Sequence, residues 1–403
     1  MVSTRRPHTA QDSARTLDTA DKFKTLRPLE RVEKSLPADA YFDPQHYLRE
    51  LNAIWFADWL CVGRSDGLDR TGHYKVVQIG DQSIIVVRST DGELKGFHNT
   101  CRHRGSLLCE ASQGSFTQGR IVCPYHAWTY SLEGQLVHTP WRLESPDFDP
   151  AQFSLYEVGV GEWGGNLFVN LDQTSATSLS ERLGGLPKLF ENWNLEKSVS
   201  AYQYRKRVNC NWKVFWENFT ECYHCPGIHP ELCRIVPRFT SGIIRASDQP
   251  DWDPESGPDP ETEPRLAPGM VTWSDDGSTQ LPYYSGLSEQ ERSLGQTFGV
   301  FMPSCFIAAH VDFVRFAHIL PVAEEQTEVV VECLFPAETV ADETHDLTPT
   351  IQFIERLTDQ DLRVCELNQR GLHSRRHQSG VLVAQEYYTH GFQNWVRERL
   401  GDQ

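Results

Sequence analysis

The sequence predicts an α+β fold that includes a small antiparallel β domain. From residue 72 to residue 172, short runs rich in β-branched residues, such as "HYKVVQIG", "QSIIVVRS" and "NLFVNL", are separated by Gly, Asp and Asn turns. Patterns typical of amphipathic helices occur before this region, at residues 41–60, and after it, at 208–223 and 348–372. The length of 403 residues is enough for two domains.

The first helix is expected within "YFDPQHYLRELNAIWFADWL", with Pro44 near its start. Helical spacing places these apolar residues roughly on one face: Tyr47, Leu48, Leu51, Ile54 and Trp55. Residues 1–35 are polar and contain no apolar core segment, so they do not form a secretory signal. We interpret them as a mobile tail of a cytosolic protein.

The second half of the chain alternates between helix, loop and strand. A segment at residues 246–290 is rich in Pro, Asp, Glu and Gly, which predicts a long surface excursion or flexible loop. Strands are expected in "SCFIAAHVDFVRFAHILPV" and "EVVVECLF". A long helix at residues 348–372 follows, with Gly371 as its C-cap.

Composition excludes several classes of function. The net charge of −17 argues against a nucleic-acid partner, because phosphate binding requires clustered Lys and Arg. No apolar run reaches the roughly 18–20 residues that span a bilayer, so no membrane partner is expected. Eleven cysteines in a long chain do not suggest a disulfide framework, and several of them stand beside histidines.

The motifs "CRHRG" and "CPYHAW" contribute two Cys and two His with the spacing of metal ligands: Cys101, His103, Cys123 and His126. Structural zinc sites usually pair two Cys in one motif and two His in the other. Here each motif supplies one Cys and one His, which suits a two-iron, two-sulfide cluster of the Rieske kind better than zinc. Both motifs are expected at hairpin tips, and Cys109 lies outside the pattern as a buried thiol.

These two motifs resemble the Rieske signature of the non-haem iron oxygenases, whose large subunits hydroxylate or demethylate small molecules. The resemblance extends from about residue 35 onward. It implies a Rieske [2Fe-2S] domain at residues 61–174 and a catalytic domain at 36–60 and 175–403, with an antiparallel sheet covered by helices. It also implies a second site, in which two His and one carboxylate hold mononuclear Fe(II) and leave positions open for O₂.

The stretch "ECYHCPGIHPEL" supplies two candidate histidines for this second site. Residues five apart on a straight helix point about 140° apart, so His224 and His229 could not share one metal there. Pro226 and Gly227 stand between them, and we expect this break to fold the chain back. The alternative is two unrelated histidines near a helix end.

The carboxylate is expected from the helix at residues 348–372. Ile354, Leu357, Asp361 and Cys365 are spaced by 3, 4 and 4 residues. This spacing puts Asp361 on the inward apolar face, where a carboxylate is costly unless it is paired or bound to metal. The position in the family motif also points to Asp361, and Asp359 is the second choice.

The resemblance also implies a path for electrons between subunits. In the family, an acidic residue bridges the Rieske cluster of one chain and the iron of its neighbour. Carried over, the path runs from His126 of one chain to Glu221 of the next and then to His224, which implies a head-to-tail ring and most simply a homotrimer. Asn218, one turn before, either forms a hydrogen bond near the iron or is an ordinary solvated residue.

The Glu at position 221 makes this stretch similar to the branch that oxidises quaternary ammonium compounds, namely glycine betaine, carnitine and proline betaine. Aromatic faces attract such cations. Several aromatic residues are available, although most belong to the core: Phe215, Trp216, Phe219, Tyr223, Phe298, Phe301, Phe306 and Phe316. His310, Arg315 and His318 either meet a substrate carboxylate or are structural polar residues in a sheet.

The implied reaction uses O₂ and electrons that NAD(P)H supplies through a separate flavin and iron–sulfur reductase, since the chain shows no Gly-rich nucleotide fingerprint. The expected substrate is a betaine-like N-methyl compound, which would be hydroxylated or demethylated. An alternative within the same chemistry is the oxygenation of an aromatic acid. An alternative of another class is an electron carrier or zinc-stabilised binding protein without catalysis.

Overall fold

The chain divides into two units. A computed structural model describes residues 26–172, 174, 177–249, 252–253, 255–257, 259 and 262–402. One unit comprises residues 55–179, and the other comprises the residues up to 54 together with those from 180 onward. The sequence placed these boundaries near residues 60 and 175. Residues 1–25 of the predicted tail lie outside the described residues, and residues 33–35 belong to strand β1 (Glu33–Pro37), which pairs with β17 (Ser379–Leu382).

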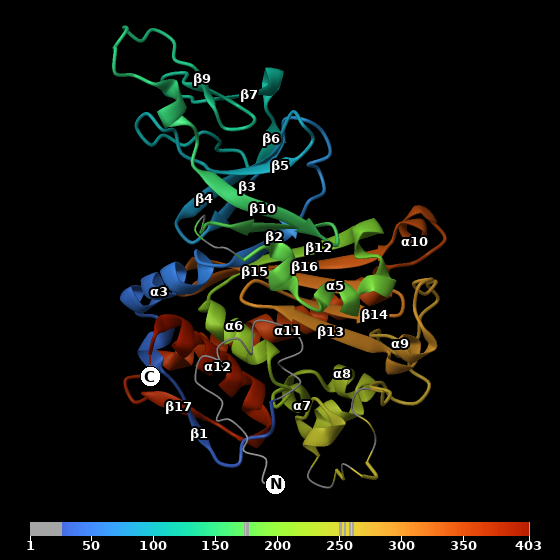
Figure 1. Cartoon of the computed structure of the whole chain (residues 1–403). Coiled ribbons are helices and arrows are strands. Elements are labelled where there is room, and N and C mark those ends of the chain that lie inside the picture. Colours follow the sequence, from blue (N-terminus) through green and yellow to red (C-terminus); the bar gives the residue numbers. More distant parts are fainter. Residues whose placement is uncertain are drawn as a thin grey trace, which may run out of the picture. The chain divides into compact units, whose positions relative to one another are not determined.

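The unit of residues 55–179 is built on an antiparallel sheet in the order β2-β11-β10-β5-β4-β3-β6. Its strands are β2 (Trp59–Arg64), β3 (His73–Ile79), β4 (Gln82–Arg88), β5 (Leu94–His98), β6 (Gln113–Ser115), β10 (Glu157–Trp163) and β11 (Asn166–Asn170). A smaller sheet contains β7 (Arg120–Val122), β8 (Thr129–Ser131) and β9 (Leu136–His138) (Figure 1). The predicted small β domain is therefore present.

The helix expected at residues 41–60 is shorter than predicted. Helix α3 (Pro44–Glu50) starts after Asp43, whose carboxylate accepts the amide hydrogens of the first turn. It continues as a π-helical turn over Leu51–Trp55, and strand β2 begins at Trp59. The periodicity failed here because the end of the segment pairs with β11 instead of extending the helix. Leu48, predicted on the apolar face, is 47% exposed.

The other unit contains an antiparallel sheet in the order β12-β16-β15-β14-β13. Its strands are β12 (Ser198–Val208), β13 (Gln296–Phe301), β14 (Cys305–His310), β15 (Val314–Ala323) and β16 (Gln326–Pro336). Helix α6 (Trp212–Phe219) contacts β15, and α11 (Thr348–Leu372) contacts β12 and α6. These two helices cover one face of the sheet (Figure 1), as the sequence predicted for this domain.

The remaining helices of this unit are short or terminal: α4 (Leu179–Leu183), α5 (Leu186–Leu189), α7 (Cys225–Ile228), α8 (Pro230–Ile235), α9 (Glu289–Leu294), α10 (Ala337–Ala341) and α12 (Tyr387–Leu400). The bounds of α11 agree with the predicted long helix. Gly371 is not its C-cap, however, because the helix continues through Leu372 and His373 takes the capping position with ordinary negative φ. Within the described residues, no helix is long and apolar enough to cross a bilayer.

The segment at residues 246–290 is not only a surface excursion. Its second half buries several apolar side chains: Leu266, Trp273, Leu281, Tyr284 and Leu287. Thr272 Oγ1 also donates a 2.6 Å hydrogen bond to the Oδ1 atom of the buried Asp312. Composition predicted a loop correctly, but it could not show that this loop packs against the rest of the unit.

Candidate metal centres

The four predicted cluster ligands lie on two loops of the unit of residues 55–179. One loop follows β5, and the other joins β7 to β8. The second motif lies at a hairpin tip as expected, because β7 and β8 pair with each other. The first motif does not, because β5 pairs with β4 and β10 and not with β6. Each loop closes with a backbone hydrogen bond four residues after its Cys: Gly105 N to Cys101 O at 2.9 Å, and Ala127 N to Cys123 O at 3.0 Å. Both residues that donate, Gly105 and Ala127, have positive φ, which allows this tight reversal.

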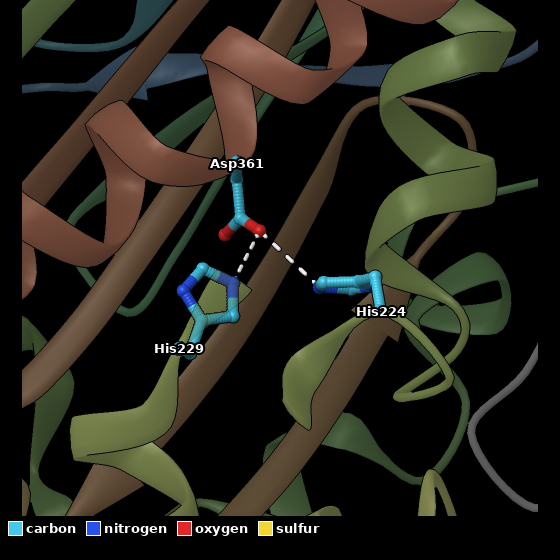
Figure 2. A group of neighbouring side chains, drawn as sticks. All are labelled: His224, His229 and Asp361. Atoms are coloured by element: carbon cyan, nitrogen blue, oxygen red, sulfur yellow. Dashed lines mark hydrogen bonds and ion pairs between the residues drawn. The ribbon is translucent and has the colours of Figure 1, made fainter. Parts of the chain in front are cut away.

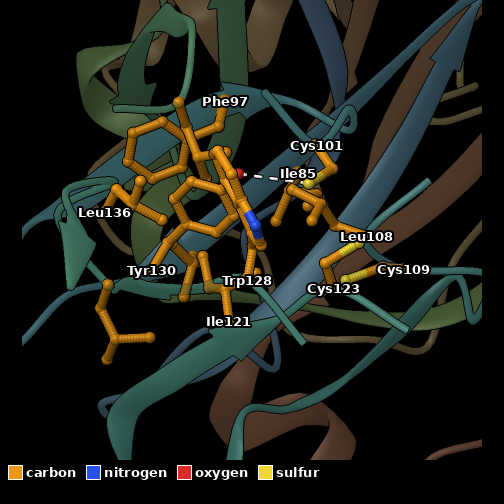
Figure 3. Packing of buried hydrophobic residues seen from close by; sticks show 13 residues of the cluster. Ile85, Phe97, Cys101, Leu108, Cys109, Ile121, Cys123, Trp128, Tyr130 and Leu136 are labelled. Carbon is orange, nitrogen blue, oxygen red and sulfur yellow. Dashed lines mark hydrogen bonds between the residues drawn. The ribbon is translucent and has the colours of Figure 1, made fainter. Parts of the chain in front are cut away.

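The cysteines point inward and the histidines outward. Cys101 and Cys123 are 3% and 2% exposed and belong to an apolar cluster that includes Ile85, Phe97 and Trp128 (Figure 3). The rings of His103 and His126 lie nearer the surface, with their centroids 4.7 Å apart. A cluster held this way has buried thiolates on one side and imidazoles facing out on the other.

Neighbouring polar groups fit a cluster at these loops. Tyr130 Oη lies 3.2 Å from Cys101 Sγ and accepts the amide hydrogen of Arg102 at 3.1 Å. Nδ1 of His126 is buried without a hydrogen-bond partner among the described residues, so a metal ion would satisfy it. Each loop supplies one Cys and one His, a pairing that fits a Rieske cluster better than tetrahedral zinc.

The second candidate centre is a group of three residues, His224, His229 and Asp361. Each offers one ligand atom, and these atoms lie within 4.8 Å of one another. Asp361 Oδ1 is 2.7 Å from His229 Nε2 and 3.4 Å from His224 Nε2 (Figure 2). Two imidazoles and one carboxylate on one side of a metal are the donor set that suits Fe(II) with open positions.

The two histidines converge for a reason different from the one predicted. Helix α6 ends at Phe219, and His224 lies beyond it as the N-cap residue of the short helix α7. Pro226 and Gly227 do not break a helix. They lie inside α7, where Pro occupies a favourable first-turn position. The chain turns at His229, which separates α7 from α8 and brings the two rings to a centroid distance of 5.3 Å.

The carboxylate comes from the predicted face of α11. Ile354, Leu357 and Cys365 are each 1% exposed, so the face on which Asp361 lies is inward. Asp359 points the other way, with 55% of its side chain exposed, and accepts a 2.6 Å hydrogen bond from Tyr204 Oη. The geometry therefore favours Asp361 over Asp359.

The opposite nitrogen of each imidazole has its own partner. Glu221 Oε1 lies 2.6 Å from His224 Nδ1, and Glu221 Oε2 accepts the His224 amide hydrogen at 3.1 Å. Gln360 Oε1 lies 2.6 Å from His229 Nδ1. When both Nδ1 atoms donate, both Nε2 atoms turn their lone pairs toward Asp361, which is the orientation a metal needs.

Glu221 and His224 do not lie on one helix, because the chain between Phe219 and Cys225 is not helical. The contact between the two residues is nevertheless direct. Gln360 was not predicted. The sequence carries no signal for it, since a Gln beside Asp361 acquires its role only when α11 lies next to His229.

Electrostatics at this centre keep Asp361 charged. Burial raises the pKa of Asp361, but contacts with the two imidazoles outweigh burial and hold the pKa well below its usual range. Burial lowers the pKa of His224, while its hydrogen bonds with Asp361, Cys225 and Glu221 raise it to about 12. Without metal the centre therefore holds protons, which a bound cation would release.

A cavity of about 320 Å³ opens onto this centre. Its lining includes all three candidate ligands together with Asn218 and Glu221. Aromatic and aliphatic side chains form much of the remainder: Phe219, Phe239, Trp273, Phe298, Tyr388, Leu189, Leu232 and Ile244. A largely apolar space next to a candidate iron site is suited to a small molecule.

Comparisons with known proteins agree with both centres. Residues 58–149 match the family model of the Rieske [2Fe-2S] domain. Residues 190–402 match the model of the ring hydroxylating alpha subunit catalytic domain. The chain belongs to the Rieske non-haem iron oxygenases. It is an oxidoreductase whose family uses a Rieske [2Fe-2S] cluster, mononuclear iron and O₂.

The relatives of this oxygenase narrow the comparison further. It is 32% identical over 389 residues to the glycine betaine monooxygenase oxygenase subunit of Chromohalobacter salexigens, a match covering 91% of this chain and 86% of that protein. It is 28% identical over 386 residues to the corresponding subunit of Pseudomonas aeruginosa, with coverages of 91% and 89%. Its fold resembles the quaternary ammonium Rieske monooxygenase CntA in complex with L-carnitine, with a TM-score of 0.67, 23% identity and coverages of 91% and 96%.

Only some of the aromatic residues predicted for the substrate site line the cavity of this oxygenase. Phe219 and Phe298 line the cavity, whereas Phe215, Trp216, Phe301, Phe306 and Phe316 are buried elsewhere and Tyr223 is 54% exposed. Trp273, Phe239 and Tyr388 were missed. A single Trp within a segment rich in Pro and acidic residues could have drawn attention to Trp273.

Of the three polar residues proposed to meet a substrate carboxylate, only one lines the cavity. Arg315 lines the cavity of this oxygenase, whereas His310 and His318 are buried away from it, at 1% and 3% exposure. The His310 ring stacks on Phe313 at 4.5 Å. Cys109 is buried in the apolar cluster near the Rieske loops, where burial raises the pKa of its thiol to about 12. It is the buried thiol that was expected.

Proposed function

We propose that this oxygenase hydroxylates an N-methyl carbon of a betaine-like quaternary ammonium compound. The observation that supports this most directly is the cavity, which combines the three candidate iron ligands with an aromatic lining. The relatives named as glycine betaine monooxygenase subunits point to the same class of substrate. The proposal also includes a cytosolic location.

The aromatic lining suits a cation that cannot form hydrogen bonds. A trimethylammonium group spreads its charge over methyl groups, and each aromatic face contributes about 0.5–2 kcal/mol of attraction. The Trp273 and Phe298 rings lie 6.1 Å apart at an angle of 62°, so they present two differently oriented surfaces. We propose these two residues, together with Phe219, Phe239 and Tyr388, as the surfaces that hold the ammonium group.

We assign the mononuclear iron to His224, His229 and Asp361. We assign one cluster iron to Cys101 and Cys123 and the other to His103 and His126. The mononuclear iron would offer open positions for O₂, and the cluster would supply electrons. The residues of the chain have a different task. Glu221 and Gln360 fix the two imidazoles, Asn218 stands beside them in the cavity wall, and the apolar lining excludes water.

The overall reaction consumes two electrons. Substrate, O₂, two electrons and two protons give an N-hydroxymethyl product and one water. This product then releases formaldehyde and a proton and leaves the demethylated amine. Because the named relatives are oxygenase subunits, we propose that a separate NAD(P)H-dependent reductase supplies the electrons.

We further propose that electrons cross between subunits of a head-to-tail homotrimer. The path would run from His126 of one subunit through Glu221 of the next to His224. The 2.6 Å contact between Glu221 and His224 supports the second half of this path. A quaternary ammonium Rieske monooxygenase with the same fold is described as using inter-subunit electron transfer.

Oxygenation of an aromatic acid is the second candidate function. The match to a ring hydroxylating catalytic domain and the aromatic residues that line the cavity favour it. The products distinguish the two functions, because an aromatic substrate gives a diol or phenol and releases no formaldehyde.

The experiment is a substrate panel of glycine betaine, carnitine, proline betaine and benzoate with iron-loaded protein and a compatible reductase. We expect formaldehyde release matched by O₂ uptake with at least one betaine. O₂ uptake without product for every betaine, combined with a hydroxylated product from benzoate, would replace the first function by the second. Iron and acid-labile sulfide analysis of the same sample should give about three irons per chain.

A further inference from the structure

Arg315 is a buried cation in the middle of the catalytic sheet. It lies on β15, between its cross-strand neighbours Ala308 on β14 and Cys333 on β16. Only 8% of the residue is exposed. Removing a guanidinium from water is costly unless an anion or several acceptors compensate for the lost hydration.

The protein compensates Arg315 only weakly. Its Nη2 atom donates a long hydrogen bond of 3.3 Å to Thr358 Oγ1, and its guanidinium lies 5.2 Å from the Phe306 ring. Its Nε atom is buried and has no hydrogen-bond partner among the described residues. Within that same part of the chain, Arg315 forms no ion pair with a carboxylate.

The other arginines that line the cavity have acceptors of their own. Arg238 Nη2 pairs with Glu263 at 2.6 Å, and Arg265 Nη1 donates to the Gln296 carbonyl at 2.9 Å. Arg245 Nε lies 3.8 Å from a carboxylate oxygen of Asp248. Arg315 differs from them because it is buried, whereas the other three are only partly buried. Its acceptor, Thr358 Oγ1, is neutral and 3.3 Å away.

Asp361 is near Arg315 but does not serve as that partner. Burial lowers the pKa of the Arg315 guanidinium, and the Asp361 charge partly offsets this effect. The Oδ1 atom of Asp361, however, contacts both His224 and His229. Arg315 therefore has donor capacity left over toward the cavity, beside the candidate iron site.

The register of the sheet places Arg315 and the aromatic ring of Phe298 in line on two strands that are separated by β14. Phe298 on β13 is the cross-strand partner of Ala308, and Ala308 is the partner of Arg315. Directly opposed residues project from the same face of a sheet. Both larger residues, Phe298 and Arg315, line the cavity.

We propose that Arg315 binds the carboxylate of the substrate and so selects compounds that carry an acid group together with the quaternary ammonium group. The inference deepens the proposed function and rests on it. The aromatic residues near Phe298 receive the cationic end, and the guanidinium receives the anionic end. An amino alcohol of the same size lacks the group that would compensate Arg315, so it is the poorer ligand.

The test uses four ligands that differ in one group at a time. Glycine betaine and choline share the ammonium group, and they differ in having a carboxylate or a hydroxymethyl group. Their carbon isosteres, tert-butylacetate and the corresponding tert-butyl alcohol analogue, repeat this difference without the positive charge. Dissociation constants are measured by anaerobic titration calorimetry on iron-loaded, full-length protein.

The variants are Arg315→Gln, Arg315→Lys and a control, Arg205→Gln. Arg205 lies on β12 with 51% of its side chain exposed and pairs with Glu328 at 2.6 Å, so its loss removes a cation from the same sheet away from the cavity. Iron content and the visible spectrum of the cluster establish that each variant retains both centres.

We expect the wild type and Arg205→Gln to bind each carboxylate roughly thirtyfold or more tightly than the matching alcohol. Arg315→Gln should lose this preference in both ligand pairs while binding the alcohols as before, and Arg315→Lys should keep part of it. Equal binding of acid and alcohol by the wild type would overturn the inference even if Arg315→Gln failed to fold. Equal loss of all four ligands in Arg315→Gln would also overturn it.

The same set of dissociation constants tests the proposed function separately. If the ammonium compounds bind no better than their carbon isosteres while the preference for carboxylates depends on Arg315, the quaternary ammonium proposal fails and the assignment of Arg315 stands. If the protein prefers the ammonium compounds but shows no preference for carboxylates, the assignment of Arg315 fails and the quaternary ammonium proposal stands.

Discussion

At the scale of single residues, the partners of Nδ1 decide what each candidate ligand histidine can do. Glu221 and Gln360 lie 2.6 Å from the Nδ1 atoms of His224 and His229. They fix the ring orientation and favour the tautomer whose Nε2 lone pair faces Asp361. Glu221 is the stronger acceptor because it is charged, so the two imidazoles have unequal surroundings.

Replacing Asp361 should remove the iron, and replacing Asp359 should not. Asp361→Asn takes away the carboxylate that lies between the two histidines, so we expect iron content to fall more than about tenfold. Asp359→Asn changes an exposed carboxylate two residues away and should leave iron content unchanged. Metal analysis after dialysis measures both. Equal iron in the two variants would contradict the assignment.

Replacing Glu221 should separate metal binding from turnover. Glu221→Gln keeps an oxygen that can accept from His224 Nδ1, so both centres should stay loaded. The variant loses the charge on the proposed path from the cluster, and we expect coupled multiple turnover to fall on the order of a hundredfold. The measurement compares formaldehyde formation and iron content in the same preparation. Turnover at the wild-type rate would refute the bridging role.

At the scale of elements, the sequence predicted those parts of the site that depend on local periodicity. The 3, 4, 4 spacing of Ile354, Leu357, Asp361 and Cys365 placed Asp361 on the inward face of α11, and the burial of its neighbours agrees. The Rieske loops also followed from motif spacing. In both cases residues close together in the sequence carry the information.

The predictions that failed depend on contacts between elements. The apolar pattern at residues 41–60 continues into β2, and only pairing with β11 shows where the helix ends. The approach of His224 and His229 depends on where α6 stops and on the turn at His229, which Pro226 alone does not indicate. Gln360 and Trp273 acquire their roles from the packing of segments distant in sequence.

Helix α6 also carries a partly buried acid, Glu217, that should make stability depend on pH. Glu217 accepts hydrogen bonds from Tyr41 Oη at 2.6 Å and Gln393 Nε2 at 2.8 Å, and so links α6 to two other segments. Burial raises the pKa of Glu217 from 4.5 to about 7, although these hydrogen bonds and Lys213 oppose the effect.

The sign of the pH effect follows from this raised pKa. Between pH 4.5 and about 7, the folded protein keeps a proton that the unfolded chain has released, so rising pH lowers the free energy of unfolding. The loss amounts to about 3 kcal/mol by pH 8. Glu217→Gln should lack this slope, and its melting temperature should rise relative to the wild type between about pH 5 and about pH 8. If the melting temperatures of the wild type and Glu217→Gln changed in parallel with pH, the raised pKa of Glu217 would be contradicted.

At the scale of the whole molecule, the proposal that electrons pass from the cluster of one subunit to the iron of the next can be tested with two complementary variants. One variant, Asp361→Asn, would keep the cluster and lose the iron. The other, Cys101→Ser, would lose the cluster and keep the iron. Each alone should be inactive. The two variants are then mixed in equal amounts and exchange subunits under native conditions. Half of the chains in the mixture carry an intact cluster, and the other half carry iron. In about a quarter of the neighbouring pairs, a chain with a cluster should therefore face a chain with iron, and these pairs should be productive.

Recovery of about a quarter of the wild-type activity per chain would support transfer between subunits. A mixture as inactive as its two components, with exchange demonstrated by mass-labelled subunits, would show that cluster and iron of the same chain work together. Any one compound that the wild-type protein turns over is sufficient as the substrate in this experiment.

The assignment of the iron to two histidines and one carboxylate is the claim on which the other proposals depend. Anomalous diffraction at the iron absorption edge, from crystals of the iron-loaded protein, tests it most directly. We predict a mononuclear peak within bonding distance of His224, His229 and Asp361, separate from the cluster peak at the Rieske loops. An iron peak held by other residues, or no iron beyond the cluster, would contradict the account.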